Sequence, residues 1–485
     1  MASGEATLMN ALQPRLLGAA LLALAATMGS PAMPVLAATF FVNSTIDAVD
    51  ANPGDGICAT AGRQCTLRAA VMEANALAGP DTIRVPAGVY ALSIPTTPQE
   101  DDASPIGQAI DASGDLDITD DLTLGGVNAK DVVVDANGIS RAFDVHVGSG
   151  KDASGLDVSI SALTIREGKV IQGVGGGIRN VGALRLAGVV VTENGAYNGG
   201  GIANSGDLKI DRSTIHKNVA EGAGGGIANW GPLDVNASTL SSNQATGSQY
   251  SDHGGALFNG VSGSALLTNV TISGNAAEVG GGISTITNVT LRNVTFGGNA
   301  ASGGAGGQAG GGIHIGNPGI VSVKHTIFAD SPSGGNCDGF AVTSNGYNVD
   351  DGMTCGLAGP GDLNNTDPAL GPLKDNGGPT HTQALSPGSK AIDAGTSAGC
   401  PATDQRGVAR PLDGDGSGGA ACDIGAYEAA GPAIKIEDIP PVGCPPFCPP
   451  DPRGGPVINP PVEKPAPIGP MPLVASPTPT PRSSR

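Results

Sequence analysis

Hydrophobic and polar residues alternate with a period of two in short segments that recur along the middle of the chain. Leu184 and Leu186 are separated by one polar residue, and Leu208 and Ile210 repeat this spacing. Side chains at alternate positions of a β-strand point to opposite faces, so the spacing predicts short strands with one buried face. A helical repeat would instead require a period near 3.6.

Blocks of glycine separate these alternating segments at regular intervals. Successive blocks begin 24, 25, 30, 26 and 30 residues apart, which is typical of a solenoid in which each repeat forms one coil. Glycine reaches positive φ without a Cβ clash, so we expect each block to form a sharp corner of its coil. The blocks begin at Gly175, Gly199, Gly224, Gly254, Gly280 and Gly310.

An asparagine marks a second position of each repeat, 19 residues after the block start in four repeats and 21 in the fifth. Asparagine tolerates left-handed backbone, and its amide can bond to the equivalent amide of the next coil. We therefore expect corners joined by hydrogen-bonded ladders, with ligand binding as the alternative. One ladder is expected along Asn194, Asn218, Asn243, Asn275 and Asn299, and another along Asn180, Asn204, Asn229 and Asn259.

The pairing of GGG-I-x-N with apolar-x-x-N over about residues 115–345 resembles the repeats of right-handed parallel β-helix proteins with the pectate-lyase-like fold. The polymorphic outer-membrane-protein type of repeat is especially similar. The resemblance implies an all-β protein, with the parallel β-helix expected over residues 96–336. It leaves the activity open, because this fold carries lyases, hydrolases, adhesins and structural spikes.

The N-terminal residues 1–38 have the layout of a secretory signal peptide. Arg15 precedes an apolar run, Leu16–Met28, and the small-residue site Val35-Leu36-Ala37 follows. The run is shorter than the roughly 20 residues that span a bilayer, although a membrane anchor is the alternative. We expect a bacterial protein that is exported and carries no transmembrane helix in the mature chain.

Residues 39–95 resemble the CSLREA domain through the run CTLRAA at 65–70, which departs from the usual pattern by Ala in place of Glu after the arginine. We expect Thr66 to cap a helix that covers the first coil as an N-terminal cap. Arg68 and Glu73 are expected on its solvated face, with a functional site as the alternative. The buried face is expected to comprise Leu67, Ala70, Val71 and Ala74.

Residues 337–428 resemble the choice-of-anchor Q domain of secreted bacterial proteins. The similar segments are DPALGPLKDNGGPTHTQALSPGSKAIDAG, CPATDQRGVARP and CDIGAYE. We expect a C-terminal capping domain here, followed over residues 429–485 by a disordered tail that holds 18 of the 37 prolines. The tail shows no recognisable anchor, so attachment to the cell surface and release to the medium both remain open.

The eight cysteines fall into local pairs, and export permits disulfides. Zinc binding is the alternative, but clusters of partner histidines are lacking. The candidate disulfide cysteines are Cys58 and Cys65, Cys337 and Cys355, and Cys400 and Cys422, with Cys444 and Cys448 as a weaker pair.

Charge narrows the range of partners. The chain carries 25 Lys and Arg against 44 Asp and Glu, a formal net charge of −19. Nucleic acid would be repelled, so we exclude it as a partner. We expect an extracellular glycan or a ligand on a host or other cell surface instead.

The acidic residues show no catalytic motif. A calcium-dependent lyase needs converging carboxylates and a basic residue, but the spacing of these acids fits turns equally well. A polygalacturonase-like hydrolase needs paired aspartates, and Asp252-His253-Gly254 is only a fragment of its pattern, with His253 expected at the surface. The candidate acids are Asp115, Asp117, Asp120, Asp121, Asp131 and Asp135.

One acidic loop resembles the start of a calcium-binding loop. Asp413, Asp415 and Ser417 supply oxygen atoms at positions 1, 3 and 5, and Gly418 lies at position 6. Position 12 is Ile424 rather than glutamate, so a flexible acidic loop is the alternative. We expect no other cofactor.

The intact repeats without a catalytic cluster predict a non-enzymatic surface or secreted protein that presents its loops for adhesion or glycan binding. A polysaccharide lyase or glycoside hydrolase is the alternative, and a structural spacer is a third class.

Overall fold

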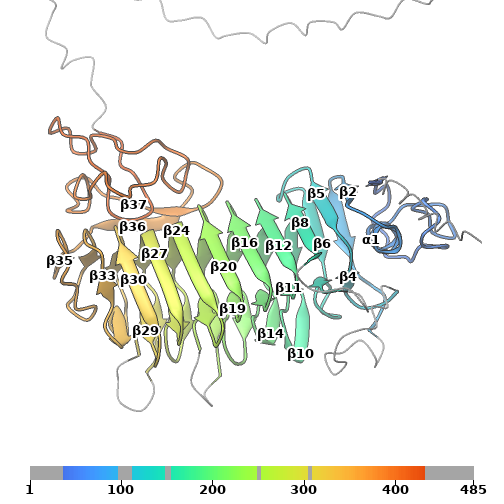
Figure 1. The fold of residues 1–485 in the computed structure, drawn as a ribbon, viewed down its shortest axis with the longest axis horizontal. Coiled ribbons are helices and arrows are strands. Elements are labelled where there is room, and N and C mark those ends of the chain that lie inside the picture. Colours follow the sequence, from blue (N-terminus) through green and yellow to red (C-terminus); the bar gives the residue numbers. More distant parts are fainter. Residues whose placement is uncertain (1–36, 97–111, 148–154, 248–252, 304–308, 432–485) are drawn as a thin grey trace, which may run out of the picture. The chain divides into compact units, whose positions relative to one another are not determined.

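The computed structural model describes residues 37–96, 112–147, 155–247, 253–303 and 309–431, all of which belong to one unit of the chain, Met1–Pro432. Most of the signal segment, the proline-rich tail beyond residue 431, Asp252, Cys444 and Cys448 lie outside these residues. The described chain is a right-handed parallel β-helix in which strands of successive coils lie side by side (Figure 1). This confirms the fold class that the alternation predicts.

The strands of the described residues form sheets of twenty, nine, six and two members. Each coil from β11 to β22 contributes one strand to the nine-stranded sheet, two to the twenty-stranded sheet and one to the six-stranded sheet. In the next two coils the single ten-residue strands β24 and β27 take the place of the two. All pairings in these three sheets are parallel, and equivalent residues face each other, as in Leu184↔Leu208↔Leu233. The fixed register places equivalent side chains of successive coils in rows along the stacking direction.

The nine-stranded sheet contains β4 (Leu116–Ile118), β7 (Phe143–Val145), β11 (Ile178–Asn180), β15 (Ile202–Asn204), β19 (Ile227–Asn229), β23 (Leu257–Asn259), β26 (Ile283–Thr285), β29 (Ile313–Ile315) and β32 (Cys337–Gly339). The six-stranded sheet contains β10 (Lys169–Val174), β14 (Gly195–Asn198), β18 (Val219–Ala220), β22 (Gln244–Ala245), β25 (Ala276–Ala277) and β28 (Ala300–Ala301).

The twenty-stranded sheet contains β1 (Thr39–Phe41), β2 (Asp81–Val85), β3 (Gly88–Ala91), β5 (Leu122–Gly126), β6 (Val132–Asp135), β8 (Asp157–Ser161), β9 (Thr164–Arg166), β12 (Ala183–Ala187), β13 (Val190–Thr192), β16 (Asp207–Asp211), β17 (Thr214–His216), β20 (Pro232–Asn236), β21 (Thr239–Ser241), β24 (Ser264–Ser273), β27 (Asn288–Gly297), β30 (Ile320–Lys324), β31 (Ile327–Ala329), β33 (Thr343–Ser344), β34 (Val349–Asp350) and β35 (Leu363–Asn364). The antiparallel pair is β36 (Leu370–Lys374) and β37 (Thr382–Leu385).

The alternating apolar residues fill the interior of the coils. Leu184, Leu208 and their equivalents are buried, and the rings of Phe296 and Phe328 stack on successive coils with centroids 4.9 Å apart. Each buried side chain removes apolar surface from water, which is the main stabilising contribution in a solenoid whose coils contact only their neighbours.

Each glycine block begins with a residue at positive φ. Gly199, for example, has φ 64°, and a Cβ there would lie 2.3 Å from the carbonyl oxygen of Ile202. Both the backbone angle and the lack of space therefore require glycine at this corner. The other block starts with positive φ are Gly175, Gly224, Gly254, Gly280 and Gly310.

Both asparagine rows bond from coil to coil. Asn218 donates through Nδ2 to Asn243 Oδ1 at 3.0 Å, and its backbone N–H donates to the same oxygen. The left-handed residue is not the asparagine, however, but the residue before it, such as Lys217 with φ 55°. The expectation of left-handed asparagines is wrong, because the turn is made one residue earlier and leaves the amide pointing inward to accept backbone N–H groups.

The other row behaves similarly. Asn180 donates to Asn204 at 2.7 Å, Asn204 to Asn229 at 2.7 Å, and Asn229 to Asn259 at 2.8 Å. Asn259 ends the row by donating to Thr287 Oγ1 at 2.7 Å.

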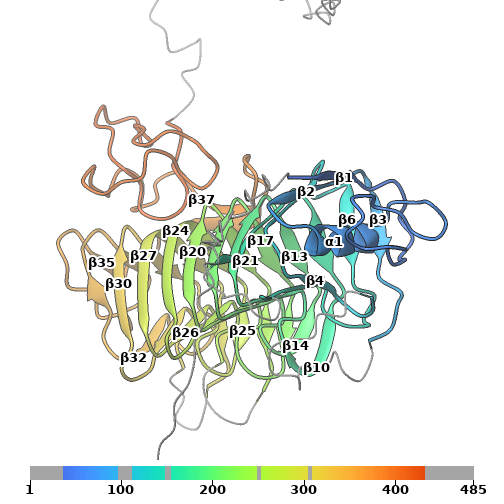
Figure 2. The ribbon, with the colours of Figure 1, turned by 45° about the vertical axis from the view of Figure 1, so that its right-hand side comes forward.

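The N-terminal region contains α1 (Leu67–Ala76), which is the one α-helix among the described residues (Figure 2). Thr66 Oγ1 accepts a hydrogen bond from the Ala69 N–H at 3.1 Å, so Thr66 is the predicted cap. The predicted apolar face is buried, and the helix contacts β2 and β4. Because this helix is short, no helix of the described residues is long and apolar enough to cross a membrane.

The prediction that Arg68 and Glu73 face solvent is wrong, because both side chains are buried. Arg68 pairs with Asp47 at 2.6 Å and donates to the carbonyl oxygen of Gly114 at 2.8 Å. Glu73 accepts hydrogen bonds from the backbone N–H groups of Gly54 and Gly56. The segment that contains Asp47, Gly54 and Gly56 covers the polar face of the helix. Arg68 and Glu73 bond to this segment and fix its position.

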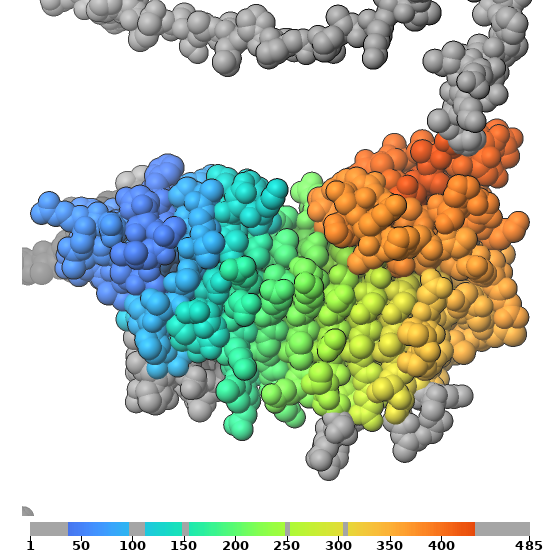
Figure 3. Space-filling view, turned by 180° about the vertical axis from the view of Figure 1, so that it is seen from behind, coloured from blue at the N-terminus to red at the C-terminus, as the bar shows by residue number. Residues whose placement is uncertain are grey.

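The parallel pairing continues past residue 336. β32 pairs with β29, β33 with β30, β34 with β31, and β35 with β34. Residues 366–431, hereafter the C-terminal lobe, then fold back along the outer side of the twenty-stranded sheet rather than across the last coil (Figures 1 and 3). Asn269 of β24 donates to the carbonyl oxygen of Thr403 at 2.9 Å, and Thr271 donates to Gln405 at 2.7 Å.

Candidate functional site

The outer face of the six-stranded sheet is hollowed along the stacking direction, and we call this surface the axial groove. One hollow of about 380 Å³ lies over β10, β14 and β18, and another of about 490 Å³ lies over β22, β25 and β28. Because β18 pairs with β22, the two hollows are neighbours on one surface.

Small residues make this face hollow. The parallel register aligns Gly195, Val219, Gln244, Ala276 and Ala300 in one outward row, where three of the five side chains hold no more than a methyl group. Larger outward side chains would fill the space above the sheet. The shape of the groove is therefore a direct consequence of the small residues of the repeat.

The two hollows differ in chemistry. The first is lined by three glutamates and two lysines, of which Lys217 and Glu193 lie 3.5 Å apart, and by Ile171, which is 77% exposed. The second is lined mainly by small and neutral polar residues, including Gln244 and Thr246. Tyr197, two residues after Gly195 on the same outward side of β14, is 46% exposed and offers an aromatic ring for stacking.

A second polar region lies at the N-terminal end of the nine-stranded sheet. We call it the N-terminal charged cluster, and it comprises Asp115, Asp117, Arg141, Asp144, His146 and Arg179. The register Asp117↔Asp144↔Arg179 sets three of these residues side by side on adjacent strands. His146 follows β7 by one residue, and its side chain is 16% exposed.

Arg141 connects the buried carboxylates of this cluster. Its Nη1 lies 3.0 Å from Asp115 Oδ2 and 3.3 Å from Asp144 Oδ2. Burial raises the pKa of Asp115 to about 6, although the Arg141 guanidinium opposes the shift. Burial also acts to raise the pKa of Asp144, but His146, Arg141 and Arg179 outweigh it and lower that pKa below its usual range.

His146 faces two carboxylates at once. Its Nδ1 lies 3.7 Å from Asp117 Oδ1 and 3.6 Å from Asp144 Oδ1. Among the described residues, neither Asp144 Oδ1 nor His146 Nδ1 has a hydrogen-bond partner, although both atoms are buried. The other oxygen of Asp144 is bonded to Arg179 at 2.9 Å.

Of the six candidate acids, two belong to the N-terminal charged cluster and four form other contacts. Asp115 and Asp117 join the cluster, whereas Asp121 accepts a hydrogen bond from the Asp157 N–H at 2.9 Å and Asp135 pairs with Arg166 at 2.8 Å. Asp131 is bonded to Asn128, and Asp120 accepts the N–H of Asp121. Sequence reasoning missed Arg141, Asp144, His146 and Arg179. An alignment of LDI at 116–118 with FDV at 143–145 carries the signal, because both segments are strands of one sheet and Asp117 then pairs with Asp144.

His253 is buried, with 2% of its surface exposed, so its expected surface position is wrong. Its carbonyl oxygen accepts the N–H of Gly224 at 2.6 Å, and it directly precedes the corner at Gly254. The packing of this corner against the neighbouring coil explains the burial.

The candidate calcium residues lie in an acidic loop of the C-terminal lobe. Asp413 and Asp415 come together with Asp393, and one oxygen of each lies within 4.8 Å of the others. Ser417 and Gly418 donate backbone N–H groups to Asp415 and Asp413 at 2.8 and 2.9 Å. The sequence pattern identified two of the three carboxylates, whereas Asp393 is about 20 residues earlier in the chain.

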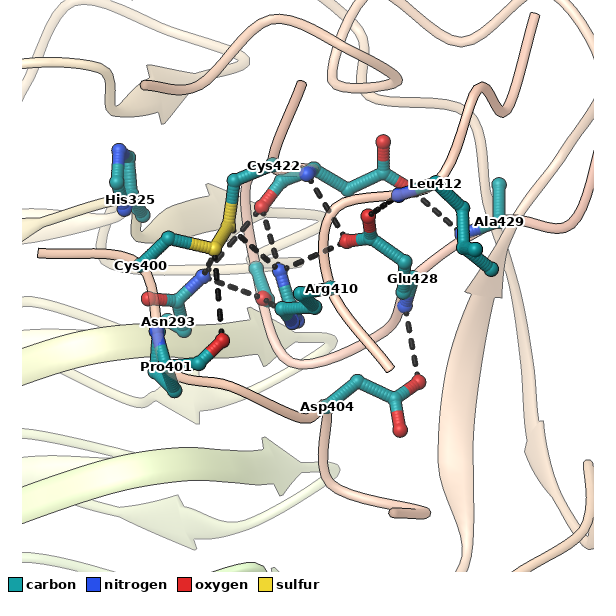
Figure 4. Close-up of polar contacts among 12 residues, drawn as sticks. Asn293, His325, Cys400, Pro401, Asp404, Arg410, Leu412, Cys422, Glu428 and Ala429 are labelled. Atoms are coloured by element: carbon teal, nitrogen blue, oxygen red, sulfur yellow. Dashed lines mark hydrogen bonds and ion pairs between the residues drawn. A yellow bond between two sulfur atoms is a disulfide. The ribbon is translucent and has the colours of Figure 1, made fainter. Parts of the chain in front are cut away.

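The three main disulfide predictions are confirmed: Cys58 bonds to Cys65, Cys337 to Cys355, and Cys400 to Cys422. The last disulfide lies beside Asn293 of β27 and Arg410 (Figure 4). It thereby belongs to the contact between the lobe and the coils.

We call the buried polar group at this contact the lobe junction; it comprises Asn293, Asp404, Arg410 and Glu428 (Figure 4), together with Asp423, whose carbonyl oxygen accepts a hydrogen bond from Arg410. Arg410 pairs with Glu428 at 3.1 Å, and neither side chain is exposed. Arg410 also donates to the carbonyl oxygens of Asp423 and Gly425, each at 2.8 Å.

Titration in the lobe junction is strongly perturbed. Burial raises the pKa of Asp423 to about 7, and it also raises the pKa of Glu428. Burial lowers the pKa of Arg410. These shifts reflect a closed interface, since the side chains bond to one another and to backbone groups.

Comparison with known proteins gives little beyond the fold. No family model matches the chain, and no curated protein sequence matches it. A crystal structure of pectate lyase Pel9A resembles it with a TM-score of 0.36 and 14% sequence identity, over 82% of this chain and 98% of that chain. A likeness at this level carries no argument about activity, and the β-helix is established by the strand pairing described above.

Proposed function

We propose that this protein is exported and binds an extended glycan along the axial groove without catalysing a reaction. The observation that carries the proposal is the pair of neighbouring hollows along the stacking direction, about 380 and 490 Å³ in volume. A groove that crosses successive coils suits a long polymer, which can contact equivalent positions of each coil. The three disulfides support export, since such bonds persist outside the reducing cytosol.

The lining of the groove suits sugar hydroxyl groups. Gln244, Thr246 and Ser302 offer donors and acceptors in the second hollow, and Lys217 with Glu193 offers charged partners in the first. Tyr197 presents a ring on which an apolar sugar face can stack. Adhesion to a glycan-coated cell surface would follow from such binding.

The test is binding of the full chain to a panel of neutral and acidic polysaccharides, followed by calorimetry on those that bind. Gly195→Trp fills the first hollow, and a Cβ there meets only the Val219 carbonyl oxygen at an ordinary 3.7 Å. We expect this variant to lose binding, whereas Arg185→Trp on the outer face of β12 retains it. Absence of binding to every glycan would instead favour a purely structural spacer.

A polysaccharide lyase or glycoside hydrolase is a second candidate, favoured by the opposite pKa shifts of Asp115 and Asp144. Against it, both carboxylates are more than nine-tenths buried and bond to the same guanidinium. Release of unsaturated or reducing ends from a polysaccharide, abolished by Asp144→Asn, would establish the enzymatic function and overturn the non-catalytic one.

We also propose that the loop of Asp413, Asp415 and Ser417, together with Asp393, binds calcium. Three carboxylates supply part of the six to eight oxygen ligands that calcium takes, with water for the remainder. Calcium should raise the unfolding temperature of the full chain, and Asp415→Asn should remove the effect. An unchanged unfolding temperature on addition of calcium would refute this site.

A further inference from the structure

We infer that Asp117, Asp144 and His146 form a binding site for a divalent transition-metal ion such as Zn²⁺. One oxygen of each aspartate and one nitrogen of His146 all lie within 4.8 Å of one another. This site is separate from the axial groove and from the acidic loop of the C-terminal lobe. It does not depend on glycan binding.

The distances suit a metal ion better than direct hydrogen bonds. The two contacts of His146 Nδ1, at 3.7 and 3.6 Å, are too long for hydrogen bonds to either carboxylate. Ligands about 2.1 Å from a tetrahedral zinc ion lie about 3.4 Å from each other, which is close to the separation observed. The ligand oxygens of the two aspartates lie within 4.8 Å of each other, so an ion between the three atoms would contact all of them once these side chains move toward it.

The atoms themselves point to a missing partner. Asp144 has a side chain that is 6% exposed, yet Oδ1 has no hydrogen-bond partner among the described residues, and the same is true of His146 Nδ1. Burying such atoms unbonded costs free energy, so buried polar atoms in folded proteins are nearly always satisfied. A cation would satisfy both at once.

The donor set selects the class of ion. One imidazole nitrogen and two carboxylate oxygens are typical of zinc and other first-row divalent ions, whereas calcium and magnesium prefer oxygen ligands alone. With three protein ligands, the fourth position would be left to water, on the side where His146 is partly exposed.

Two neighbouring arginines orient Asp144 without occupying the position of the ion. Arg141 and Arg179 contact Asp144 through Oδ2, at 3.3 and 2.9 Å, and leave Oδ1 toward His146. Hydrogen bonds to the second oxygen of a ligating carboxylate fix its orientation. The two positive charges weaken the attraction for a cation, so the carboxylates of Asp117 and Asp144 must supply the negative charge that binds it.

The position of the site links the first coils to the N-terminal cap. Asn75 of α1 donates to the Asp117 carbonyl oxygen at 2.7 Å, and Asp117 and Asp144 lie on the adjacent strands β4 and β7. An ion bound here would tie these strands together. We therefore expect metal binding to stabilise the cap and the coils next to it.

The test is calorimetric titration of ZnCl₂ into the full chain after removal of metals with a chelator. We expect one site in the micromolar range or tighter and a rise in unfolding temperature. Replacing zinc by cobalt(II) should give visible absorption bands of a four-coordinate nitrogen–oxygen site. His146→Gln should abolish the site and the bands while leaving the circular dichroism spectrum unchanged.

His314→Gln is the matched control, because His314 pairs with Asp338 at 2.9 Å on the same nine-stranded sheet but has no third ligand among the described residues. This variant should keep the zinc site. Absence of zinc binding by the unaltered chain, or binding that survives His146→Gln, would overturn the proposal. Asp144→Asn should reproduce the loss, and Asp413→Asn should not, which separates this site from the acidic loop.

Discussion

The N-terminal charged cluster and the lobe junction are both buried groups of arginine and carboxylate side chains, but they differ in how the carboxylates are bonded. In the lobe junction each oxygen of Asp423 and Glu428 accepts at least one N–H group. In the cluster Asp144 Oδ1 accepts none from the described residues. Both regions contain an acid with a raised pKa, Asp115 at about 6 and Asp423 at about 7.

This difference shows that a perturbed pKa alone does not separate a site from scaffold. Burial raises the pKa in both places, whether or not a ligand could bind. Buried unbonded atoms occur in both regions, including Arg410 Nε and Asn293 Oδ1 in the lobe junction. The distinguishing feature of the cluster is that a buried carboxylate oxygen and a histidine nitrogen, both potential metal ligands, face each other without a hydrogen bond. The following experiments test whether the two regions differ in this way.

Arg410→Ala should have the largest effect, a loss of about 4 kcal/mol in the free energy of unfolding of the C-terminal lobe. The variant leaves the Glu428 carboxylate buried without its cation and removes donors to two carbonyl oxygens. Hydrogen exchange measured by mass spectrometry should show loss of protection across residues 366–431. Arg185→Ala, at an exposed position, serves as the control and should change nothing measurable.

Removing the disulfide with Cys400→Ala and Cys422→Ala should cost about 3 kcal/mol, because this bond closes a loop with a sequence separation of 22 residues. The loss should be confined to the lobe in the same exchange experiment. Cys58→Ala with Cys65→Ala should affect only the N-terminal cap. If Cys400→Ala with Cys422→Ala also reduced protection in the coils, the effect of this disulfide would not be confined to the lobe.

The lobe should also lose stability as pH rises toward neutrality. Burial raises the pKa of Asp423 from 3.8 to about 7, so between these values the native side chain keeps a proton that the unfolded chain releases. The resulting stabilisation is fully present below about pH 4 and lost as pH approaches 7, by about 2 kcal/mol between pH 5 and 7. Asp423→Asn should flatten this slope in denaturant unfolding; an unchanged slope would show that another group is responsible.

His146→Gln should have the smallest effect on the metal-free protein, below about 0.5 kcal/mol, because its Nδ1 makes no hydrogen bond that the substitution could break. Urea unfolding with and without a chelator measures this directly. A large loss in the metal-free protein would show that the N-terminal charged cluster is scaffold, like the lobe junction.

The repeat region was predictable because its information is local and periodic. Leu184 and Leu208 show the strand period, and Gly199 and Gly224 show the corner that every coil needs. When the coils stack in register, residues at equivalent positions of the repeat become neighbours. Both asparagine ladders could therefore be predicted from the sequence. The left-handed residue was placed one position too late, because its identity varies among Glu193, Lys217 and Ser242 and leaves no mark.

The ends were harder to predict because their contacts are distant in sequence and not periodic. Arg68 appears solvated on a helical wheel, and only the folded chain brings Asp47 and the Gly114 carbonyl oxygen to it. The N-terminal charged cluster arises from register between β4 and β7, which precede the first glycine block at Gly175 and so carry no repeat mark. Neither the partners of Arg68 nor those of His146 could be read from one segment alone.

The lateral placement of the C-terminal lobe has a mechanical consequence. The lobe contacts β24 through Thr403 and Gln405, β27 through Gly425, and the segment after β30 through Thr396, whose N–H donates to His325 Nε2. A pull applied where the lobe ends, at residue 431, would therefore be shared in shear by several coils instead of peeling the last coil from the stack. If the chain is held at this end, the hydrogen bonds between the lobe and several coils would have to break together before the coils separate.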